Sequence, residues 1–197
     1  MTKEKIAYLN HKISEQDDQH AFEQLYRHYH AGLLSYAMTL VEHRELAEEV
    51  VEDVFIKIWT NRKTLATISN FSYYLYTAAK HTSLNYHSKR KRSATDSIDP
   101  ADNEIFLDYN DPEMSVIRQE NISVIENAIN TLPEKCRLVF RLIKDDGLKY
   151  KEVAQLLGLS QKTIEAHMSL AYSRILTNLQ ENLPEYALHK SSRTGNY

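Results

Sequence analysis

The chain has 197 residues, of which only four are glycine and four are proline. This length suits one large domain or two small ones, and so few turn-forming residues disfavour a β fold and favour long helices. The single cysteine, Cys136, excludes an internal disulfide and a cysteine-built zinc site, and we expect it to be a small buried side chain in a reducing cytosol. No apolar run reaches the length of a transmembrane helix, and the charged N-terminus lacks the apolar segment of a signal peptide, so the expected location is cytoplasmic.

The net charge of −3 is unevenly distributed along the chain. Residues 80–92 contain five basic residues and no acidic one, whereas residues 94–120 contain eight acidic residues and a single arginine. Exposed charges farther apart than about 10 Å are largely screened at ordinary salt, so a basic segment can still hold phosphate groups. The acidic total therefore does not exclude nucleic acid as a partner.

Asp17 and Asp18 can cap a helix whose apolar residues recur at helical spacing up to about Leu40. Its predicted core residues are Phe22, Leu25, Tyr26, Tyr29, Leu33 and Leu34. The same region carries three histidines that could suggest a metal site, namely His28, His30 and His43. No carboxylate stands beside them in a ligand motif, so we expect neither a metal nor a cofactor.

Residues 44–62 predict a second helix with one apolar half. That half contains Leu46, Ala47, Val50, Val51, Val54, Phe55 and Ile58. The opposite half is acidic, with an apolar residue among the acids and an aromatic one at the border, and comprises Glu49, Glu52, Asp53, Ile56 and Trp59. These residues leave two interpretations open, a solvated acidic face with a stray isoleucine or a protein docking surface.

Residues 69–92 predict one long helix with two different sides. The buried stripe comprises Phe71, Leu75, Ala78, Ala79, Thr82 and Tyr86, with Tyr74 near its edge. The other side projects Tyr73, Tyr76, Lys80, Leu84 and His87, and the basic cluster Lys89, Arg90, Lys91 and Arg92 follows. Unpaired bases stack on exposed rings while cations hold the phosphates, so this side suits single-stranded nucleic acid. The alternative is a helix that packs its tyrosines on a neighbour, and the basic cluster favours nucleic acid.

Residues 93–111 show no helical period and are rich in Asp, Ser, Asn and Pro, so they predict an acidic flexible linker. Asp111 and Pro112 can then begin a further helix, and Pro133 can begin another. The predicted core residues of the two helices are Ile117, Ile122, Ile125, Ala128, Ile129, Leu132, Cys136, Val139, Phe140 and Ile143. The polar tail after Pro184 is expected to fray, and its sequence indicates no role.

Residues 147–176 carry the spacing of a helix-turn-helix. Ala154 is small enough for two helices to cross, Gly158 can adopt the positive φ that the turn needs, and Ser160 can cap the second helix. Lys149, at the expected cap of the first helix, cannot accept backbone N–H bonds there. The predicted buried stripe of the second helix is Ile164, Met168, Ala171 and Ile175, and the outward residues are Gln161, Lys162, Glu165, Ala166 and Ser169. This is the layout of a recognition helix in the major groove, so the motif predicts DNA binding rather than a plain amphipathic hairpin.

Two helical modules on an acidic tether resemble the bacterial RNA polymerase sigma factors of the extracytoplasmic-function group, over about residues 21–183. In the first module the likeness rests on AFEQLYRHYHAGLLSYA, AEEVVEDVFIKIW and FSYYLYTAAKHTSLNYHSKRKR. In the second it rests on LPEKCRLVFRLIKDDGLKYKEVAQLLGLSQKTIEAHMSLAYSRI. The resemblance implies an all-α protein of two small domains, with a region 2-like domain at 1–92, the linker at 93–111, a region 4-like domain at 112–183 and the tail at 184–197.

The resemblance implies a specificity subunit that directs core RNA polymerase to the promoters of a restricted gene set and is not an enzyme. Its docking surface on the clamp of the largest polymerase subunit would comprise Glu49, Glu52, Asp53, Ile56 and Trp59. The minus-ten element would be read and melted by Tyr73, Tyr74, Tyr76, Thr77, Lys80, His81, Leu84, Lys89, Arg90, Lys91 and Arg92. The minus-thirty-five element would be contacted by Gln161, Lys162, Thr163, Glu165, Ala166, His167, Ser169 and Arg174. A cognate anti-sigma factor is also implied, without insertion of this chain into a membrane.

The chain departs from the family pattern at four positions of the third helix. Tyr74 stands where many members have Trp, Thr77 where Arg is usual, His81 where Asn is frequent, and Asn85 where Asp is frequent. The minus-ten base preference is therefore not carried over from the family. The alternative function is an autonomous helix-turn-helix regulator whose first 92 residues bind a ligand or form a dimer, and it predicts a homodimer on half-sites about 34 Å apart. An all-helical metal enzyme built on the histidines is a third alternative.

Overall fold

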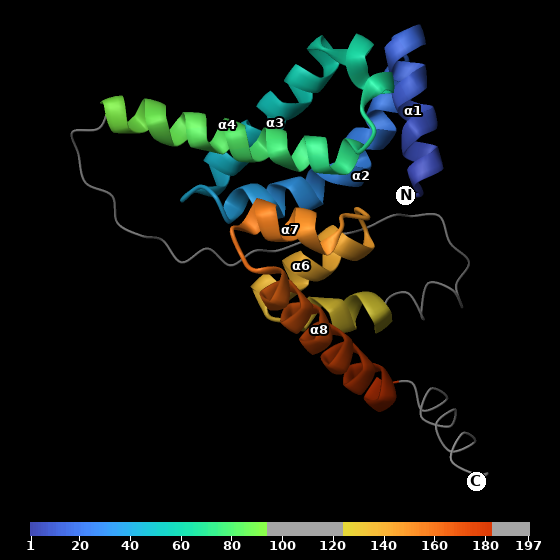
Figure 1. Cartoon of the computed structure of the whole chain (residues 1–197), viewed down its shortest axis with the longest axis vertical. Coiled ribbons are helices and arrows are strands. Elements are labelled where there is room, and N and C mark those ends of the chain that lie inside the picture. The colour runs from blue at the N-terminus through green and yellow to red at the C-terminus, as the bar shows by residue number, and fades with distance from the viewer. Residues whose placement is uncertain (94–123, 183–197) are drawn as a thin grey trace.

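The computed structural model describes residues 1–93 and 124–182, with the side chains of those residues except 87–93. In the first range the helices are α1 (Lys3–Gln16), α2 (Gln19–Met38), α3 (Arg44–Thr60), the 3-10 helix η1 (Arg62–Thr67) and α4 (Phe71–Ser93). In the second, residues 124–130 are helical, followed by α6 (Glu134–Lys144), α7 (Tyr150–Leu157) and α8 (Gln161–Asn182). Neither range contains a strand, which confirms the predicted all-α class (Figure 1).

Helix α1 is not among the predicted elements. Thr2 Oγ1 accepts a hydrogen bond of 3.3 Å from the backbone N–H of Lys5 and so caps the start of the helix. Ile6, Leu9 and Ile13 lie three or four residues apart and are all buried, on a helix that packs against η1 and α2. The charged residues of this segment are mostly exposed, so α1 is an ordinary amphipathic helix.

The N-terminal module, which we define as residues 1–93, is built on α2, α3 and α4. Asp18 Oδ1 accepts a 2.9 Å hydrogen bond from the backbone N–H of Ala21, so the predicted cap of α2 is confirmed. Helix α3 contacts both α2 and α4, and the apolar half predicted for it faces this core. The largest fully buried side chains of these three helices are Leu25, Tyr29, Leu33, Tyr36, Ile58, Leu75 and Tyr76.

The C-terminal module, which we define as residues 124–182, is built on α6, α7 and α8. Cys136 is buried, and its thiol donates a 3.1 Å hydrogen bond to the backbone carbonyl of His167 on α8. Burial raises the pKa of this thiol, because a thiolate loses hydration there. The expectation of a small buried cysteine is therefore confirmed.

The helix at residues 124–130 carries part of the predicted core. Ala128, Ile129 and the following Leu132 are buried, whereas Ile125 is 39% exposed, contrary to its predicted place in the core. The other predictions for this part of the chain lie outside the described residues: the acidic linker, the cap at Asp111 and Pro112, Ile117 and Ile122, and the tail after Pro184.

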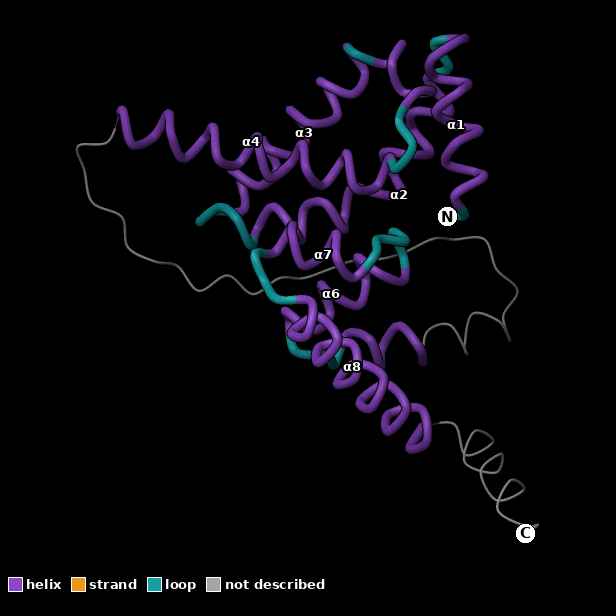
Figure 2. The backbone as a smooth tube through the Cα atoms, in the orientation of Figure 1, coloured by secondary structure: helices purple, strands orange, loops and turns teal. Residues whose placement is uncertain are grey.

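The two modules pack against each other. Helix α6 contacts α2, and α7 contacts α4, so the C-terminal module lies against α2 and α4 of the N-terminal module (Figures 1 and 2). The buried apolar side chains form one continuous cluster that runs from Ile6 in α1 to Ala171 in α8. None of the described helices has the length and apolar character needed to cross a membrane.

Candidate nucleic-acid and polymerase interfaces

The turn between α7 and α8 has the geometry that the helix-turn-helix spacing predicts. Gly158 follows α7 with φ of +66°, a backbone conformation that glycine adopts without strain. Ala154 is buried where the helices meet, and its carbonyl accepts a 3.0 Å hydrogen bond from the backbone N–H of Leu159. Ser160 Oγ accepts a 3.0 Å hydrogen bond from the backbone N–H of Thr163 and so caps α8, as predicted.

The start of α7 is capped differently from the start of α8. Lys149 stands at the cap position and, as expected, its side chain accepts no backbone bond, because an ammonium group has no lone pair. Its backbone N–H instead donates a 2.8 Å hydrogen bond to Glu152 Oε2, one half of a capping box. Glu152 Oε1 also accepts a 2.9 Å bond from Asn70 Nδ2, which belongs to the other module.

The predicted minus-thirty-five residues lie on the free side of α8. Ile164, Met168 and Ala171 are buried against α6 and α7, so the opposite side of the helix faces solvent. On that side Gln161, Lys162, Glu165, Ala166, Ser169 and Arg174 are exposed, and Thr163 and His167 are half-buried. The N-terminal half of α8 is therefore open to a DNA groove in this structure.

The predicted minus-ten residues of α4 divide into two sets. Tyr74, His81 and Leu84 are exposed, whereas Tyr73, Thr77 and Lys80 are half-buried. The prediction that Tyr76 projects outward is wrong, because this side chain is 0% exposed and lies under the C-terminal module. The basic cluster, Lys89, Arg90, Lys91 and Arg92, is in the last turns of α4, but its side chains lie outside the described residues.

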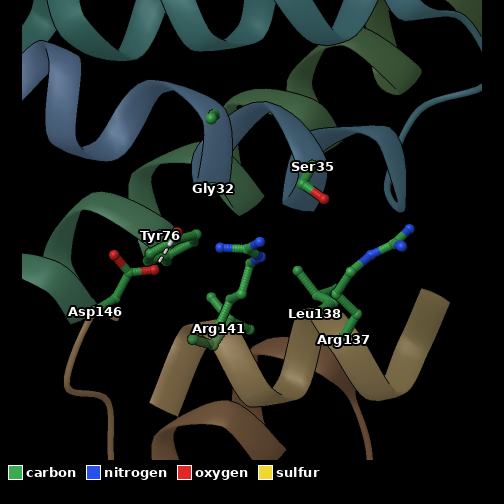
Figure 3. Close-up of a pocket in the computed structure, with 9 residues that line it drawn as sticks. Gly32, Ser35, Tyr76, Arg137, Leu138, Arg141 and Asp146 are labelled. Atoms are coloured by element: carbon green, nitrogen blue, oxygen red, sulfur yellow. Dashed lines mark hydrogen bonds between the residues drawn. The ribbon is translucent and has the colours of Figure 1, made fainter. Parts of the chain in front are cut away.

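Three side chains of α4 bond directly to the C-terminal module. The Tyr73 hydroxyl donates a 3.0 Å hydrogen bond to Gln155 Oε1. Lys80 Nζ donates two bonds of 2.9 Å, to the backbone carbonyls of Gln155 and Leu156. The Tyr76 hydroxyl donates a 2.7 Å bond to Asp146 Oδ2 (Figure 3). One side of α4 thus packs its tyrosines on a neighbouring helix, which was the alternative interpretation of that side.

The acidic side of α3 exposes three of the five predicted docking residues. Glu49, Glu52 and Ile56 are exposed, and Ile56, at 62%, is the most exposed of the large apolar side chains in the described part of the chain. Asp53 is half-buried and accepts a 3.2 Å hydrogen bond from the Tyr86 hydroxyl. Trp59 is also half-buried, with its ring centroid 5.0 Å from that of Phe22 and the Arg62 guanidinium 4.7 Å above it. We call Glu49, Glu52 and Ile56 the α3 ridge.

Asp146 lies between the modules, and no sequence pattern pointed to it. It stands in the loop between α6 and α7 and is only 8% exposed. Burial raises the pKa of its carboxyl to about 7, against the lowering effect of the Tyr76 hydrogen bond. His28 Nε2 of α2 lies 3.9 Å from Asp146 Oδ1, and burial lowers the pKa of this imidazole to about 4. Between these two pKa values both groups are neutral, so we regard the contact as a neutral pair and not a salt bridge.

Arg141 is a second buried polar group at this junction. Its side chain extends from α6 toward α2 (Figure 3) and is 6% exposed. Its two Nη atoms bond to Glu126 Oε2 at 2.8 Å and to Asp145 Oδ2 at 3.2 Å, so its charge is balanced within the C-terminal module. Among the described residues no group of three or more His, Cys, Asp or Glu side chains is arranged to hold a metal ion.

Both modules match family descriptions. Residues 25–93 match "Sigma-70 region 2" and residues 122–175 match "Sigma-70, region 4". The first match covers most of α2 and all of α3 and α4, and the second contains the helix-turn-helix. Helix α1 lies outside both matches.

Two solved structures are similar to the chain at low identity. The sigma factor RpoE in complex with the anti-sigma factor NepR from Bartonella quintana is 24% identical and has a TM-score of 0.46, over 81% of this chain and 96% of that one. The structure of CnrH in complex with the cytosolic domain of CnrY is 18% identical and has a TM-score of 0.43, over 90% of this chain and 98% of that one.

Curated relatives match nearly the whole chain. The RNA polymerase sigma factor YlaC of Bacillus subtilis is 24% identical over 84% of this chain and 95% of its own length. The RNA polymerase sigma-H factor of Pseudomonas aeruginosa is 26% identical over 94% and 99%. The ECF RNA polymerase sigma-E factor of Escherichia coli is 25% identical over 84% and 90%. With a region 2 match, a region 4 match and these relatives, the chain belongs to the extracytoplasmic-function group of bacterial RNA polymerase sigma factors.

Proposed function

We propose that this sigma factor, which directs core RNA polymerase to promoters and starts transcription at a restricted gene set, divides that work among three surfaces. The α3 ridge docks on the clamp of the largest polymerase subunit. The aromatic and basic side of α4 holds the melted minus-ten strand. The N-terminal half of α8 reads the minus-thirty-five element as intact duplex. The chain works in the cytoplasm, beside its polymerase.

One observation carries the proposal: α8 presents a capped helix with a continuous exposed polar side at its N-terminal half. Lys162 is exposed near the helix start, where a recognition helix meets base edges, and lysine can donate to the O6 and N7 acceptors of guanine. Arg174 is exposed three turns farther on, where a cation can contact the phosphate backbone. The two residues therefore have different roles, base reading for Lys162 and positioning for Arg174.

Promoter melting needs no chemical step from this chain. Unpaired bases can stack on tyrosine rings while ammonium and guanidinium groups hold the strand phosphates, and base stacking of this kind is not available in closed duplex. Because the protein then binds the open strand better than the duplex, binding itself shifts the equilibrium toward melted DNA. We accordingly propose a binding factor that is not an enzyme.

The α3 ridge has the composition of a protein interface centre. Ile56 supplies an apolar contact that would be buried on docking, and Glu49 and Glu52 supply charges that can steer the approach to a basic partner surface. Asp53 and Trp59 are partly engaged within the module, so we assign them a supporting role at the edge of the ridge. A cognate anti-sigma factor, proposed from the resemblance alone, would act by competing for such surfaces.

Reconstituted transcription tests the proposal. Purified chain is mixed with core polymerase that lacks a specificity subunit, and run-off RNA is measured on a library of promoter-length DNA. We expect RNA to start from a subset of templates that share two unlike boxes. An autonomous regulator would instead sediment as a homodimer and protect a palindrome without polymerase. Failure to start RNA from any template would overturn the proposal.

A further inference from the structure

A polar cavity lies where three separate segments of the chain meet. It has a volume of about 390 Å³, which is within the range of small-molecule sites. Its walls come from one side of α1, from residues 68–72 at the start of α4, and from the α6–α7 loop with the start of α7 (Figure 1). None of the lining residues belongs to the proposed promoter and polymerase surfaces, so the proposed function does not account for this cavity.

Helix α1 contributes a buried amide to the lining. Asn10 is 3% exposed, and its Oδ1 atom is buried without a hydrogen-bond partner. A buried acceptor without a donor destabilises the fold, because the hydration that it loses is not replaced. Turning the amide about its terminal bond presents either Oδ1 or Nδ2 to the cavity, so Asn10 can bond a hydroxyl group there in either orientation. The amide therefore favours an occupant that carries hydroxyl groups.

The start of α4 offers backbone donors to the same cavity. The first N–H groups of a helix have no partner within it. Asn70 Oδ1 accepts a 3.2 Å hydrogen bond from the backbone N–H of Tyr73, which leaves the N–H groups of Phe71 and Ser72 ahead of it. The dipole of this 23-residue helix also favours negative charge at its N-terminal end. This wall of the cavity therefore suits an anionic group.

Two lysines line the cavity, one from each module. Lys3 begins α1, Lys149 directly precedes α7, and both are exposed. A phosphate group at neutral pH carries between one and two negative charges and three acceptor oxygens, whereas a carboxylate carries one charge and two oxygens. Two ammonium groups together with a helix start match the phosphate better, because each charge then has a partner.

Two carboxyl groups also line the cavity, and both already accept hydrogen bonds. Glu152 accepts bonds of 2.8 Å from the backbone N–H of Lys149 and 2.9 Å from Asn70 Nδ2. Asp146 accepts the Tyr76 bond, and burial raises the pKa of its carboxyl to about 7, so much of its charge is neutralised by a proton near neutral pH. Their remaining lone pairs can accept from hydroxyl groups, but they would repel a second anionic group. The lining thus suits one anionic group and several hydroxyl groups.

We propose that this cavity binds a small phosphorylated polyol, of which a sugar phosphate is the simplest case, with its phosphate at Lys3, Lys149 and the start of α4 and a hydroxyl group at Asn10. Such a ligand contacts both modules at once. Its binding is therefore linked to their contact and stabilises the folded chain. The site is separate from the surfaces proposed for DNA and polymerase, and the transcription assay tests those independently.

The first experiment compares three matched probes on the full chain. Ribose 5-phosphate has both features, ribose lacks the phosphate, and inorganic phosphate lacks the sugar hydroxyl groups. Isothermal titration calorimetry gives each Kd, and amide NMR shifts locate the site. We expect ribose 5-phosphate to bind more tightly than either partial probe and to shift the N–H signals of Phe71, Ser72 and Gly147. No binding of ribose 5-phosphate, or equal affinity for inorganic phosphate, would overturn the proposal.

A pair of double variants tests the phosphate end of the cavity. Lys3→Gln/Lys149→Gln removes both lining cations from exposed positions, so the fold should persist. The matched control Lys5→Gln/Lys151→Gln removes the same charge from exposed positions of α1 and α7 outside the lining. We expect the first variant to bind ribose 5-phosphate at least about tenfold more weakly, because it loses two charge-assisted contacts, and the control to match the wild type. Equal Kd values for the two variants would place the phosphate elsewhere.

A second variant fills the cavity without changing a charge. Ala7 is an exposed lining residue of α1, and the indole in Ala7→Trp would occupy the space beside it. Ribose 5-phosphate binding should be lost while the helical circular dichroism stays at its wild-type value. Ala66→Trp, an exposed alanine of η1 outside the lining, is the control and should bind normally. Wild-type affinity in a folded Ala7→Trp variant would show that the ligand does not bind in this cavity.

Discussion

We propose that helices α4 and α8 both bind promoter DNA, yet the structure presents them in opposite ways. The outward side of α8 is polar, and it is free from Gln161 through Ser169. The outward side of α4 is rich in tyrosine, and it is covered where Tyr73, Tyr76 and Lys80 meet the C-terminal module. A polar surface has little to gain from packing, whereas rings suited to stacking on bases also pack well on protein. A helix suited to binding single strands therefore has a second possible partner in its own chain.

The largest expected effect comes from the α3 ridge, the surface that we propose docks on polymerase and so brings both helices to the promoter. Ile56→Arg should abolish co-purification with core polymerase and all run-off RNA, because it places a charge at the centre of the proposed interface. Binding of the free protein to minus-thirty-five duplex should persist, since α8 is remote from the α3 ridge. Tyr8→Arg, another exposed large side chain, 52% exposed on α1, serves as the matched control. Retained polymerase binding by the Ile56 variant would remove the ridge from the proposal.

The second prediction concerns the covered region and its dependence on pH. Burial raises the pKa of Asp146 from 3.8 to about 7, so its protonated form is favoured in the folded state. Its contribution to the free energy of unfolding is therefore complete below about pH 3.8 and is lost as the pH rises toward 7. His28, with its pKa lowered to about 4, contributes stability that is full above 6.5 and is lost as pH falls toward 4. From pH 4 to 6.5 the two effects oppose each other, so together they should change the free energy of unfolding little.

Single variants should separate the two effects. In Asp146→Asn only His28 titrates, and the free energy of unfolding in urea should rise with pH, relative to wild type, by on the order of 1 kcal/mol per unit. In His28→Gln it should fall by a similar amount. Asp145, Arg141 and the chain N-terminus also act electrostatically on Asp146, but they are unchanged in both variants. Parallel pH profiles for all three proteins would show that the buried pair does not titrate as described.

A third prediction tests whether α4 binds phosphates beyond the covered part. Replacing Lys89, Arg90, Lys91 and Arg92 by Ala should reduce the salt dependence of minus-ten strand binding, by about 0.7 in the logarithmic slope for each phosphate that the variant no longer neutralises. Minus-thirty-five binding should keep its slope. An unaltered slope on the single strand would mean that other cations of the chain hold the phosphates.

The smallest expected effects lie within the free region. Lys162→Ala should weaken minus-thirty-five binding by about 1–3 kcal/mol and relax preference at one base pair, because alanine cannot donate to the edge of a guanine. Arg174→Ala should weaken binding to all duplex sequences alike, because a phosphate is present at every sequence. Competition binding against single-base variants of the upstream box distinguishes the two. The same base preference in both variants would mean that recognition depends on other side chains.

Regular spacing made the C-terminal module predictable from the sequence. The small Ala154, the positive φ of Gly158 and the Ser160 cap are local requirements of one turn, so the residues themselves indicate the geometry. Ile6, Leu9 and Ile13 carry the same kind of spacing for α1, but they stand among many charged residues, which obscure the pattern.

The covered side of α4 could not be predicted in the same way. Periodicity places Tyr76 outside the core stripe of its helix, but it cannot distinguish solvent from the rest of the fold. The Tyr76 ring lies 5.4 Å from that of Tyr36 on α2, and its hydroxyl bonds to the C-terminal module. Asp146, the acceptor of Tyr76, stands 70 residues farther along the chain. Only the packing of α6 and α7 on α2 and α4 brings the two together, and no local pattern encodes that arrangement.

Helix α1 has a practical consequence for anyone who prepares this protein. A chain trimmed to the matched span would begin at residue 25, and so would lack α1 and the capped start of α2. The apolar surfaces of η1 and α2 that Ile6, Leu9 and Ile13 cover would be exposed to solvent. Such a fragment should therefore fold poorly and aggregate. Samples for spectroscopy or crystallisation should therefore retain residues 1–24. A purification tag at the N-terminus should be followed by a spacer, so that Thr2 can still cap α1.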